Sequence, residues 1–229
     1  MKFNGSRDAK SLLAGLRGVE IGGSAHNPFG LNTINVDRFS GTDTVCKQSE
    51  QALCGEVLPV DVIAEGDELP FGDRIFDFVI SSHVIEYFYD PVRAIREWCR
   101  VSRRYVFIIC PHKGRANEED RLAEETTHAD LLRRMRTKGD SNLLVHQTFW
   151  TLGGFLAAFA GLLPPGWRLV LARDPDDKVG NGFTVVYQRV RSKRATQEFK
   201  PDIQRSVSRS RLNRAGSSIA SLAGRRRPR

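Results

Sequence analysis

The segment YVFIIC at residues 105–110 is an uninterrupted apolar run, too short for a typical helix. Consecutive apolar side chains indicate a strand that is covered on both faces, as in a parallel sheet between helices. Asp90 and Pro91 upstream are suited to the cap and first turn of a helix that runs to about Arg100. The apolar residues of that helix lie on one face. This helix and strand therefore predict an α/β sheet.

The same patterns predict the other elements of the fold. Further strands are expected at 18–22, 33–37, 58–64, 74–82, 167–172 and 182–190. Further helices are expected at 10–17, 44–54, in part of 113–145, and at 147–162. The turn-forming sequence DPDDKVGNG between the last two strands favours a hairpin. The predicted fold class is α/β: a doubly wound, Rossmann-like, mostly parallel sheet of seven strands that closes with an antiparallel hairpin.

Length and charge divide the chain into one domain and a tail. With 229 residues and 40% hydrophobic residues, the chain can bury one substantial core. We assign residues 1–190 to this domain, with 113–163 as a helical insertion on the substrate side. From Arg189 onward the chain holds 13 of its 35 basic residues but only two of its 27 acidic residues. The net charge of +8 therefore belongs to the tail, residues 191–229, which we expect to be largely disordered.

The cysteines and the ends of the chain indicate a cytoplasmic protein. The four cysteines form no CxxC pair and have no histidines at matching spacing, so no metal site is predicted. They indicate reduced thiols. The first ten residues lack the apolar core of a signal peptide. The longest apolar run, 149–163, is interrupted by glycines and falls short of the roughly 20 residues that cross a bilayer.

Two acidic residues end neighbouring predicted strands. Glu20 is followed by the small residues Gly22, Gly23 and Ser24, which allow the backbone to approach a ligand closely. Asp37 ends the second strand, 17 residues after Glu20, where a carboxylate can accept hydrogen bonds from ribose hydroxyls. The turn has no GxGxxG pattern and no lysine, and Glu20 would repel a phosphate. A positively charged nucleoside therefore fits this turn better than a pyrophosphate.

The sequence EGDELPFGDRIFDFVISSHVIEYFYDPVRAIREWCRV at residues 65–101 lies in register with EIGGS and NVD. This arrangement resembles class I S-adenosylmethionine-dependent methyltransferases of the type 11 kind. The resemblance implies S-adenosyl-L-methionine as the cofactor, with its methionyl part near the glycine turn, its ribose on Asp37 and its adenine edge near Glu65 or Gly66. Ser24 and His26 stand where the second and third glycines of such a turn are usual. The implied cofactor-binding residues are Glu20, Gly22, Gly23, Ser24, Asp37, Glu65, Gly66 and Ser82.

Three later motifs concern the methyl acceptor. PHK at 111–113, TTHADLL at 126–132 and HQTFW at 146–150 resemble a subgroup associated with glycan and cell-surface polysaccharide pathways. That resemblance implies O-methylation of a sugar hydroxyl in a glycan or glycolipid precursor. A hydroxyl needs a base at neutral pH, and the candidates are His112 and His146.

Each candidate side chain also has a structural interpretation. His83 is expected either to shape the floor of the site or to cap its strand, and His146 has the alternative of capping the helix that follows. Trp150 is the aromatic residue that we would test as a platform for a sugar, although its neighbours Phe149, Phe155 and Phe159 have the spacing of a helix core.

Other functions remain open at this stage. The acceptor is alternatively a lipid, a quinone or a small metabolite. A further alternative is a nucleic-acid-binding protein or RNA methyltransferase that uses the arginine-rich tail. The tail itself has three interpretations: a solvated appendage, a segment that binds the anionic inner face of a membrane, or a nucleic-acid-binding segment. Nucleic acid is the least favoured, because the body is mildly acidic and no NPPY-like motif follows the fourth strand.

Overall fold

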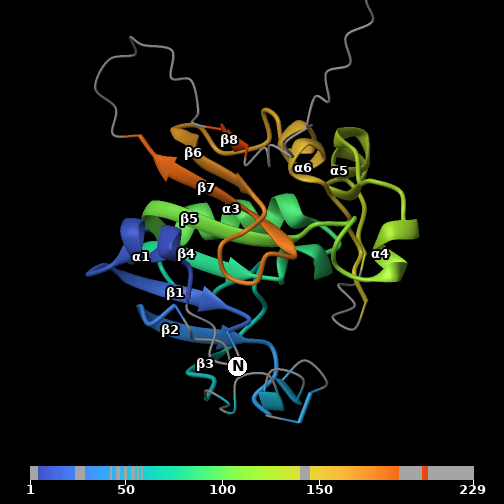
Figure 1. Cartoon of the computed structure of the whole chain (residues 1–229). Helices are drawn as coiled ribbons and strands as arrows, with labels where there is room; N and C mark the ends of the chain where they lie inside the picture. The colour runs from blue at the N-terminus through green and yellow to red at the C-terminus, as the bar shows by residue number, and fades with distance from the viewer. Residues whose placement is uncertain are drawn as a thin grey trace, which may run out of the picture.

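A computed structural model shows the arrangement of the chain (Figure 1). It describes residues 5–23, 29–41, 43–44, 47–48, 51–52, 55, 57, 59–139, 145–190 and 203–205.

One sheet contains all the strands of the described residues. The strands are β1 (Arg17–Ile21), β2 (Asn32–Asp37), β3 (Val62–Ile63), β4 (Phe76–Ser82), β5 (Ser102–Pro111), β6 (Trp167–Asp174), β7 (Gly182–Arg189) and β8 (Ile203–Arg205). Their order across the sheet is β3-β2-β1-β4-β5-β7-β6-β8 (Figure 1). β1 to β5 pair in parallel, whereas β7 is antiparallel to both β5 and β6. The predicted fold class and its closing hairpin are therefore confirmed.

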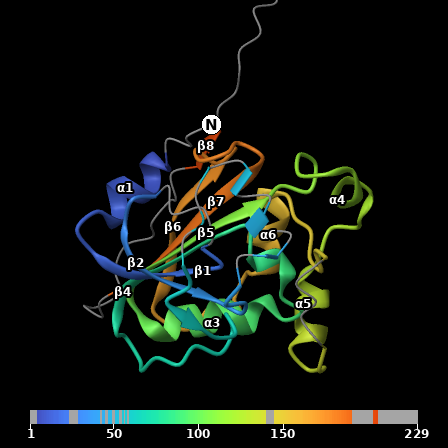
Figure 2. The same ribbon diagram turned by 90° about the horizontal axis from the view of Figure 1, so that it is seen from below.

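The helices cover both faces of this sheet (Figure 2). They are α1 (Arg7–Leu13), α3 (Pro91–Val101), α4 (Glu118–Leu122), α5 (His128–Arg134), α6 (Leu152–Ala158) and the short 3-10 helix η1 (Ile85–Tyr87). The helix α1 packs on one face, and α3 packs on the other. No helix within the described ranges is long and apolar enough to cross a membrane.

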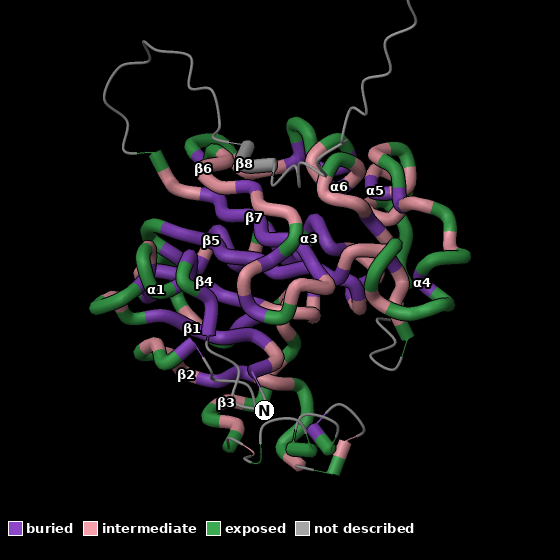
Figure 3. The backbone as a smooth tube through the Cα atoms, in the orientation of Figure 1, coloured by how far each residue is buried: buried purple, intermediate pink, exposed green. Residues whose placement is uncertain are grey.

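Two hydrophobic cores lie on opposite sides of the sheet, and the buried strands between them are visible in Figure 3. The larger core joins alternate strand residues such as Val19 and Val106 to Trp98 of α3 and to Phe155 of α6. The smaller core joins Phe78 and other residues of the opposite face to α1. Successive side chains of a strand point to opposite faces, so a strand covered on both sides must be apolar throughout. The run YVFIIC meets this requirement in β5.

The predicted caps of α3 are present. The Asp90 carboxylate accepts hydrogen bonds from the backbone N–H groups of Val92 and Arg93, both at 3.1 Å. Pro91 occupies the first turn, where its missing N–H costs no hydrogen bond. The helix buries Trp98, whose Nε1 donates to the carbonyl of Gly66 at 2.7 Å. α3 is thereby fixed to the segment that follows β3.

Several predicted bounds differ from the structure. The first helix ends at Leu13 rather than at residue 17. The third strand, expected over 58–64, is regular only at Val62–Ile63. The helix expected at 147–162 begins at Leu152, because Gln147 and Thr148 donate their backbone N–H groups to the carbonyl of Glu86 instead.

Two predicted segments are described only in part. Within the predicted helix 44–54, residues 47–48 and 51–52 are helical, and residues 45–46, 49–50 and 53–54 lie outside the described residues. Within the tail, β8 pairs in parallel with β6 and adds an eighth strand. The rest of residues 191–229 lies outside the described residues, so its disorder stays a prediction.

Gly18 of β1 gives a test of packing in the sheet. A Cβ at this position would overlap the ring of Phe78 on the neighbouring strand, which is fully buried and has no room to move. We expect Gly18→Ala to lower the free energy of unfolding by about 1–3 kcal/mol, measured by urea denaturation. Gly153→Ala in α6 is the matched control, because the nearest atom to its Cβ is 4.0 Å away. Equal effects of the two variants would contradict the close packing of β1 on β4.

Candidate functional site

The predicted site residues gather at the carboxyl edge of the sheet. β1, β2, β4 and β5 run in parallel, so the residues at their ends meet along one edge. Glu20 lies near the end of β1, Asp37 ends β2, His83 follows β4 and His112 follows β5. Strand order reverses between β1 and β4, the position where ligands bind in open α/β sheets. Sequence positions from 20 to 112 are therefore brought to one place.

The bend after β1 contains two glycines that are closely packed against other residues. Gly22 has a φ of +67°, and its N–H donates to the carbonyl of Val36 at 2.8 Å. A Cβ on Gly22 would lie 2.6 Å from a methyl group of Val84. A Cβ on Gly23 would lie 2.7 Å from the carboxyl carbon of Glu20. The positive φ of Gly22 requires glycine, and a Cβ on Gly23 would displace the Glu20 side chain. Ser24 and His26 lie outside the described residues, so the role of Ser24 stays a prediction.

Two acids stand at the tips of neighbouring strands. Glu20 is buried, with its side chain against Gly23. One oxygen of the Asp37 carboxylate accepts from the backbone N–H of Phe39 at 2.9 Å, and the other lies 3.9 Å from Nζ of Lys47. Each carboxylate oxygen has two lone pairs, so Asp37 keeps acceptor capacity for the hydroxyls of a ribose. This arrangement fits the adenosyl part of S-adenosylmethionine.

The pair Glu65 and Gly66 follows β3. Glu65 forms an ion pair with Arg38, with 2.8 Å between Nε and Oε1. A Cβ on Gly66 would lie 2.8 Å from the Phe88 ring, and the carbonyl of Gly66 already accepts from Trp98. Gly66 thus serves the packing of α3, and a contact of either residue with an adenine edge stays a proposal.

His146 is held between two acids. Its Nδ1 lies 2.9 Å from both carboxylate oxygens of Asp120, which is buried at the start of α4. Its Nε2 lies 3.8 Å from Oε1 of Glu86. Since a carboxylate only accepts hydrogen bonds, Asp120 fixes the proton of His146 on Nδ1 and leaves the Nε2 lone pair available. His146 has the tautomer that a base requires.

Glu86 is a buried acid whose carboxyl group forms no hydrogen bond within the described part of the chain. Its side chain is 1% exposed. Burial, with a smaller contribution from the charge of Asp120, raises the pKa of the Glu86 carboxyl well above 4.5. Neither Glu86 nor Asp120 is among the site residues predicted from the sequence. Glu86 was visible as the last residue of SSHVIE, but nothing local marked Asp120.

His112 is less suited to act as a base. Its Nδ1 accepts a hydrogen bond from the backbone N–H of Gly114 at 3.0 Å, and its Nε2 lies 3.8 Å from a carboxylate oxygen of Asp174. The Nδ1 lone pair is therefore in use, and the proton of the neutral ring lies on Nε2. Burial, followed by the charge of Arg115, lowers the pKa of His112.

His83 lies at the end of β4 with a φ of +57°. Its Nε2 is buried without a partner among the described residues. Burial, and then the charge of Lys178, lowers the pKa of His83 to about 4, so its ring is neutral at physiological pH. A neutral buried ring fits the predicted floor of the site. The preceding Ser82 accepts a hydrogen bond on Oγ from Nζ of Lys178 at 3.0 Å.

Trp150 belongs to the core. Its side chain is fully buried, and its Nε1 donates to the carbonyl of Thr126 at 3.0 Å. It contacts Phe155 and Phe159, in line with the helix-core interpretation of these aromatics. The hypothesis of Trp150 as a sugar platform is therefore wrong.

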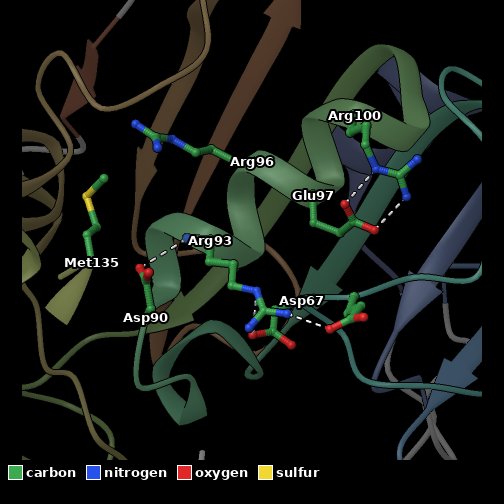
Figure 4. A pocket seen from close by; sticks show the side chains of 8 residues that line it. Asp67, Asp90, Arg93, Arg96, Glu97, Arg100 and Met135 are labelled. Atoms are coloured by element: carbon green, nitrogen blue, oxygen red, sulfur yellow. Dashed lines mark hydrogen bonds and ion pairs between the residues drawn. The ribbon is translucent and has the colours of Figure 1, made fainter. Parts of the chain in front are cut away.

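A separate cavity of about 500 Å³ lies on the outer face of α3. Figure 4 shows its side chains: Arg93 turns toward Asp67, and Arg100 pairs with Glu97. None of the predicted site residues lines it. We assign the site to the carboxyl edge of the sheet, because the acids and histidines converge there. Among the described residues no group of three or more His, Cys, Asp or Glu side chains is placed to hold a metal ion.

Comparison with known proteins finds a family model that matches part of the chain. A family described as "Methyltransferase domain" matches residues 22–110, from the glycine bend to the end of β5. No curated protein matches the sequence. Residues 22–110 match a methyltransferase domain, and the chain is an S-adenosylmethionine-dependent methyltransferase, with S-adenosylmethionine as the methyl donor.

Solved structures with a similar arrangement are distant in sequence. A SAM-dependent methyltransferase from Aquifex aeolicus is 18% identical, with a TM-score of 0.44 over 78% of this chain and 85% of that one. A SAM-dependent methyltransferase from Mesorhizobium loti is 15% identical, with a TM-score of 0.47 over 77% and 92%. A putative methyltransferase from Haloferax volcanii, in complex with the Trm112 activator, is 14% identical, with a TM-score of 0.49 over 81% and 88%.

The buried carboxyl of Glu86 predicts a specific pH dependence. A raised pKa in the folded state means that the carboxyl contributes stability below about 4.5, its ordinary value, and that this contribution is lost as the pH rises. We expect Glu86→Gln to become increasingly more stable than the parent protein as the pH rises above about 4.5, because only the parent must ionise a buried carboxyl. Urea denaturation of both proteins at a series of pH values measures the difference. His83 is present in both proteins, so its own contribution to the pH dependence cancels. A difference that does not change with pH would contradict the raised pKa.

Proposed function

We propose that this methyltransferase transfers the methyl group to a sugar hydroxyl of a glycan or glycolipid precursor. The observation that carries the proposal is the pair His146 and Asp120, which combines a lone pair on Nε2 with a fixed proton on Nδ1. A hydroxyl must lose its proton as its oxygen takes up a methyl group. A sulfur or a neutral amine acceptor needs such a base less.

In this proposal, different residues of the chain bind the donor and remove the proton of the acceptor. S-adenosylmethionine supplies a methyl carbon that is activated by a positively charged sulfur. Asp37 binds the ribose, and the glycine bend after β1 receives the neighbouring part of the donor. His146 takes the hydroxyl proton on Nε2, and Asp120 stabilises the resulting imidazolium through its hydrogen bond to Nδ1. His83 stays neutral and adds no positive charge beside the sulfur.

Two exposed apolar side chains support a lipid-linked acceptor. Leu122 is 82% exposed and Val145 is 53% exposed. Leu122 lies two residues after Asp120, and Val145 directly precedes His146. Exposed apolar side chains on the two segments that carry this pair suit an amphiphilic molecule, such as a sugar attached to a lipid. This observation also keeps a lipid or quinone as the second candidate acceptor.

The position of β8 supports a role of the tail at a membrane surface. β6 runs in the same direction as β5, and β8 is parallel to β6. The chain after Arg205 therefore starts from the edge of the sheet that carries the candidate site. Residues 206–229 contain seven arginines and no acidic residue. Each such charge is worth about 1 kcal/mol near an anionic lipid surface. We propose that the tail holds a cytoplasmic enzyme at the inner face of the membrane, near a glycolipid acceptor.

Transfer of a labelled methyl group tests the acceptor class. The full chain is incubated with labelled S-adenosylmethionine and, separately, with nucleotide sugars, glycolipids, quinones and RNA. We expect label in the sugar-containing acceptors, as a methyl ether that survives alkaline hydrolysis. Label only in quinones or lipids without sugar would support the second candidate, and label only in RNA would contradict both.

Asp37 provides a test of donor binding. We expect Asp37→Ala to weaken binding of S-adenosylhomocysteine at least about tenfold, because hydrogen bonds to a charged acceptor are worth about 1.5–3 kcal/mol each. Isothermal titration calorimetry measures this affinity. Asp43→Ala, which changes an exposed acid after the same strand, is the control. Unchanged affinity of the Asp37 variant would refute its assignment to the ribose.

His146 provides a test of the base. We expect His146→Gln to lower kcat about 10²–10⁴-fold, with unchanged affinity for S-adenosylhomocysteine. His112→Gln is the matched control, because the Nδ1 lone pair of His112 is already used by Gly114. A fall in kcat for His112→Gln but not for His146→Gln would reverse the assignment.

A further inference from the structure

Lys178 is a buried cation beside the end of β4. Its residue is 8% exposed, its Nζ donates to Oγ of Ser82 at 3.0 Å, and the ammonium lies 4.5 Å above the ring of Phe29. Lys178 comes from the loop 175–181 between β6 and β7, which bends back toward β4 (Figure 1). Phe29 belongs to the connection that follows the glycine bend. The ammonium therefore lies between the two segments that flank the expected methionyl end of the donor.

The loop that carries Lys178 is rigidly held. The Asp176 carboxylate accepts hydrogen bonds from the backbone N–H groups of Lys178, Val179, Gly180 and Gly182. Asp177 accepts from the backbone N–H of Asp8 in α1 at 3.0 Å. Because these bonds are formed within the protein, little entropy remains to be lost when a ligand contacts Lys178.

Lys178 and Glu20 approach the site from the same face of the sheet. Val19 and Ile21 point into the α3 side of the core, so Glu20 between them points to the α1 side. Phe78 and Ile80 of β4 also point to the α1 side, and Ser82 continues their alternation. One anion and one cation thus stand at the tips of adjacent strands. An amino acid group, with an ammonium and a carboxylate on one carbon, has the complementary pair of charges.

We infer that Lys178 binds the α-carboxylate at the amino-acid end of S-adenosylmethionine, with Glu20 facing the ammonium. The inference rests on S-adenosylmethionine as the donor. A lysine next to the positive sulfur would repel the donor on its own, and pairing with the donor's only negative group offsets that repulsion. Lys178 is therefore a residue that determines donor specificity. Because the donor's carboxylate balances its charge, no negative charge is required on the acceptor.

Three adenosyl ligands separate the charges of the amino-acid end. S-adenosylhomocysteine carries both the ammonium and the carboxylate, its decarboxylated analogue keeps the ammonium alone, and 5′-methylthioadenosine carries neither. Titration calorimetry of the full chain with each ligand gives the contribution of the carboxylate. We expect the parent protein to prefer S-adenosylhomocysteine over the decarboxylated analogue at least about tenfold. We expect Lys178→Met to lose this preference while binding 5′-methylthioadenosine as the parent does.

Matched variants keep the test decisive. Lys178→Arg should retain the preference, because it keeps the charge, and Lys10→Met changes an exposed lysine of α1 and should have no effect. A retained preference in Lys178→Met, or an equal loss for all three ligands, would overturn the inference while leaving the donor assignment intact. Absence of any preference in the parent protein would overturn it even if Lys178→Met did not fold. If the parent protein bound none of the three ligands, the proposed function itself would fail.

Discussion

The parallel pairing of β1 with β2 on one side and with β4 on the other determines where the site residues lie. In this arrangement Glu20, Asp37 and His83 reach the same edge although they are far apart in sequence. The carbonyl of Glu86 then connects this edge to the segment that precedes α6. It accepts hydrogen bonds from the backbone of Gln147 and Thr148, so His146 is held next to the end of β4. These bonds, together with the contact with Asp120, fix the position of His146 relative to β4.

The sequence predicted the elements whose side-chain pattern is local. The apolar run of β5, the cap at Asp90 and the turn before β7 depend on neighbouring residues, and each is present. The residues predicted to bind the methyl donor followed from strand order and a resemblance, which require no knowledge of side-chain contacts. Their contacts with the donor stay predictions. What failed was set by distant partners. The start of the last helix depends on a carbonyl some 60 residues away, and Trp150 is buried by contacts with a helix rather than exposed.

The residues that sequence reasoning missed share one property: their partners are distant. Asp120 meets His146 across 26 residues, and Lys178 meets Ser82 across 96 residues. The motif TTHADLL also has a local structural use. Asp130 forms a capping box with Thr127 at the start of α5. Capping stabilises the first turn of this short helix, so the residue has a structural use at that position.

The ion pair between Asp8 and Arg173 joins residues that are 165 positions apart. It connects the first helix of the domain to the end of β6, next to the loop that carries Lys178. The ion pair thus joins the first helix of the domain to one of its last strands. Trimming the chain ahead of β1 would remove this ion pair and the hydrogen bond between Asp8 and Asp177, although α1 holds none of the predicted donor-binding residues. The amino-terminal helix therefore helps to hold the end of β6 and the loop that carries Lys178.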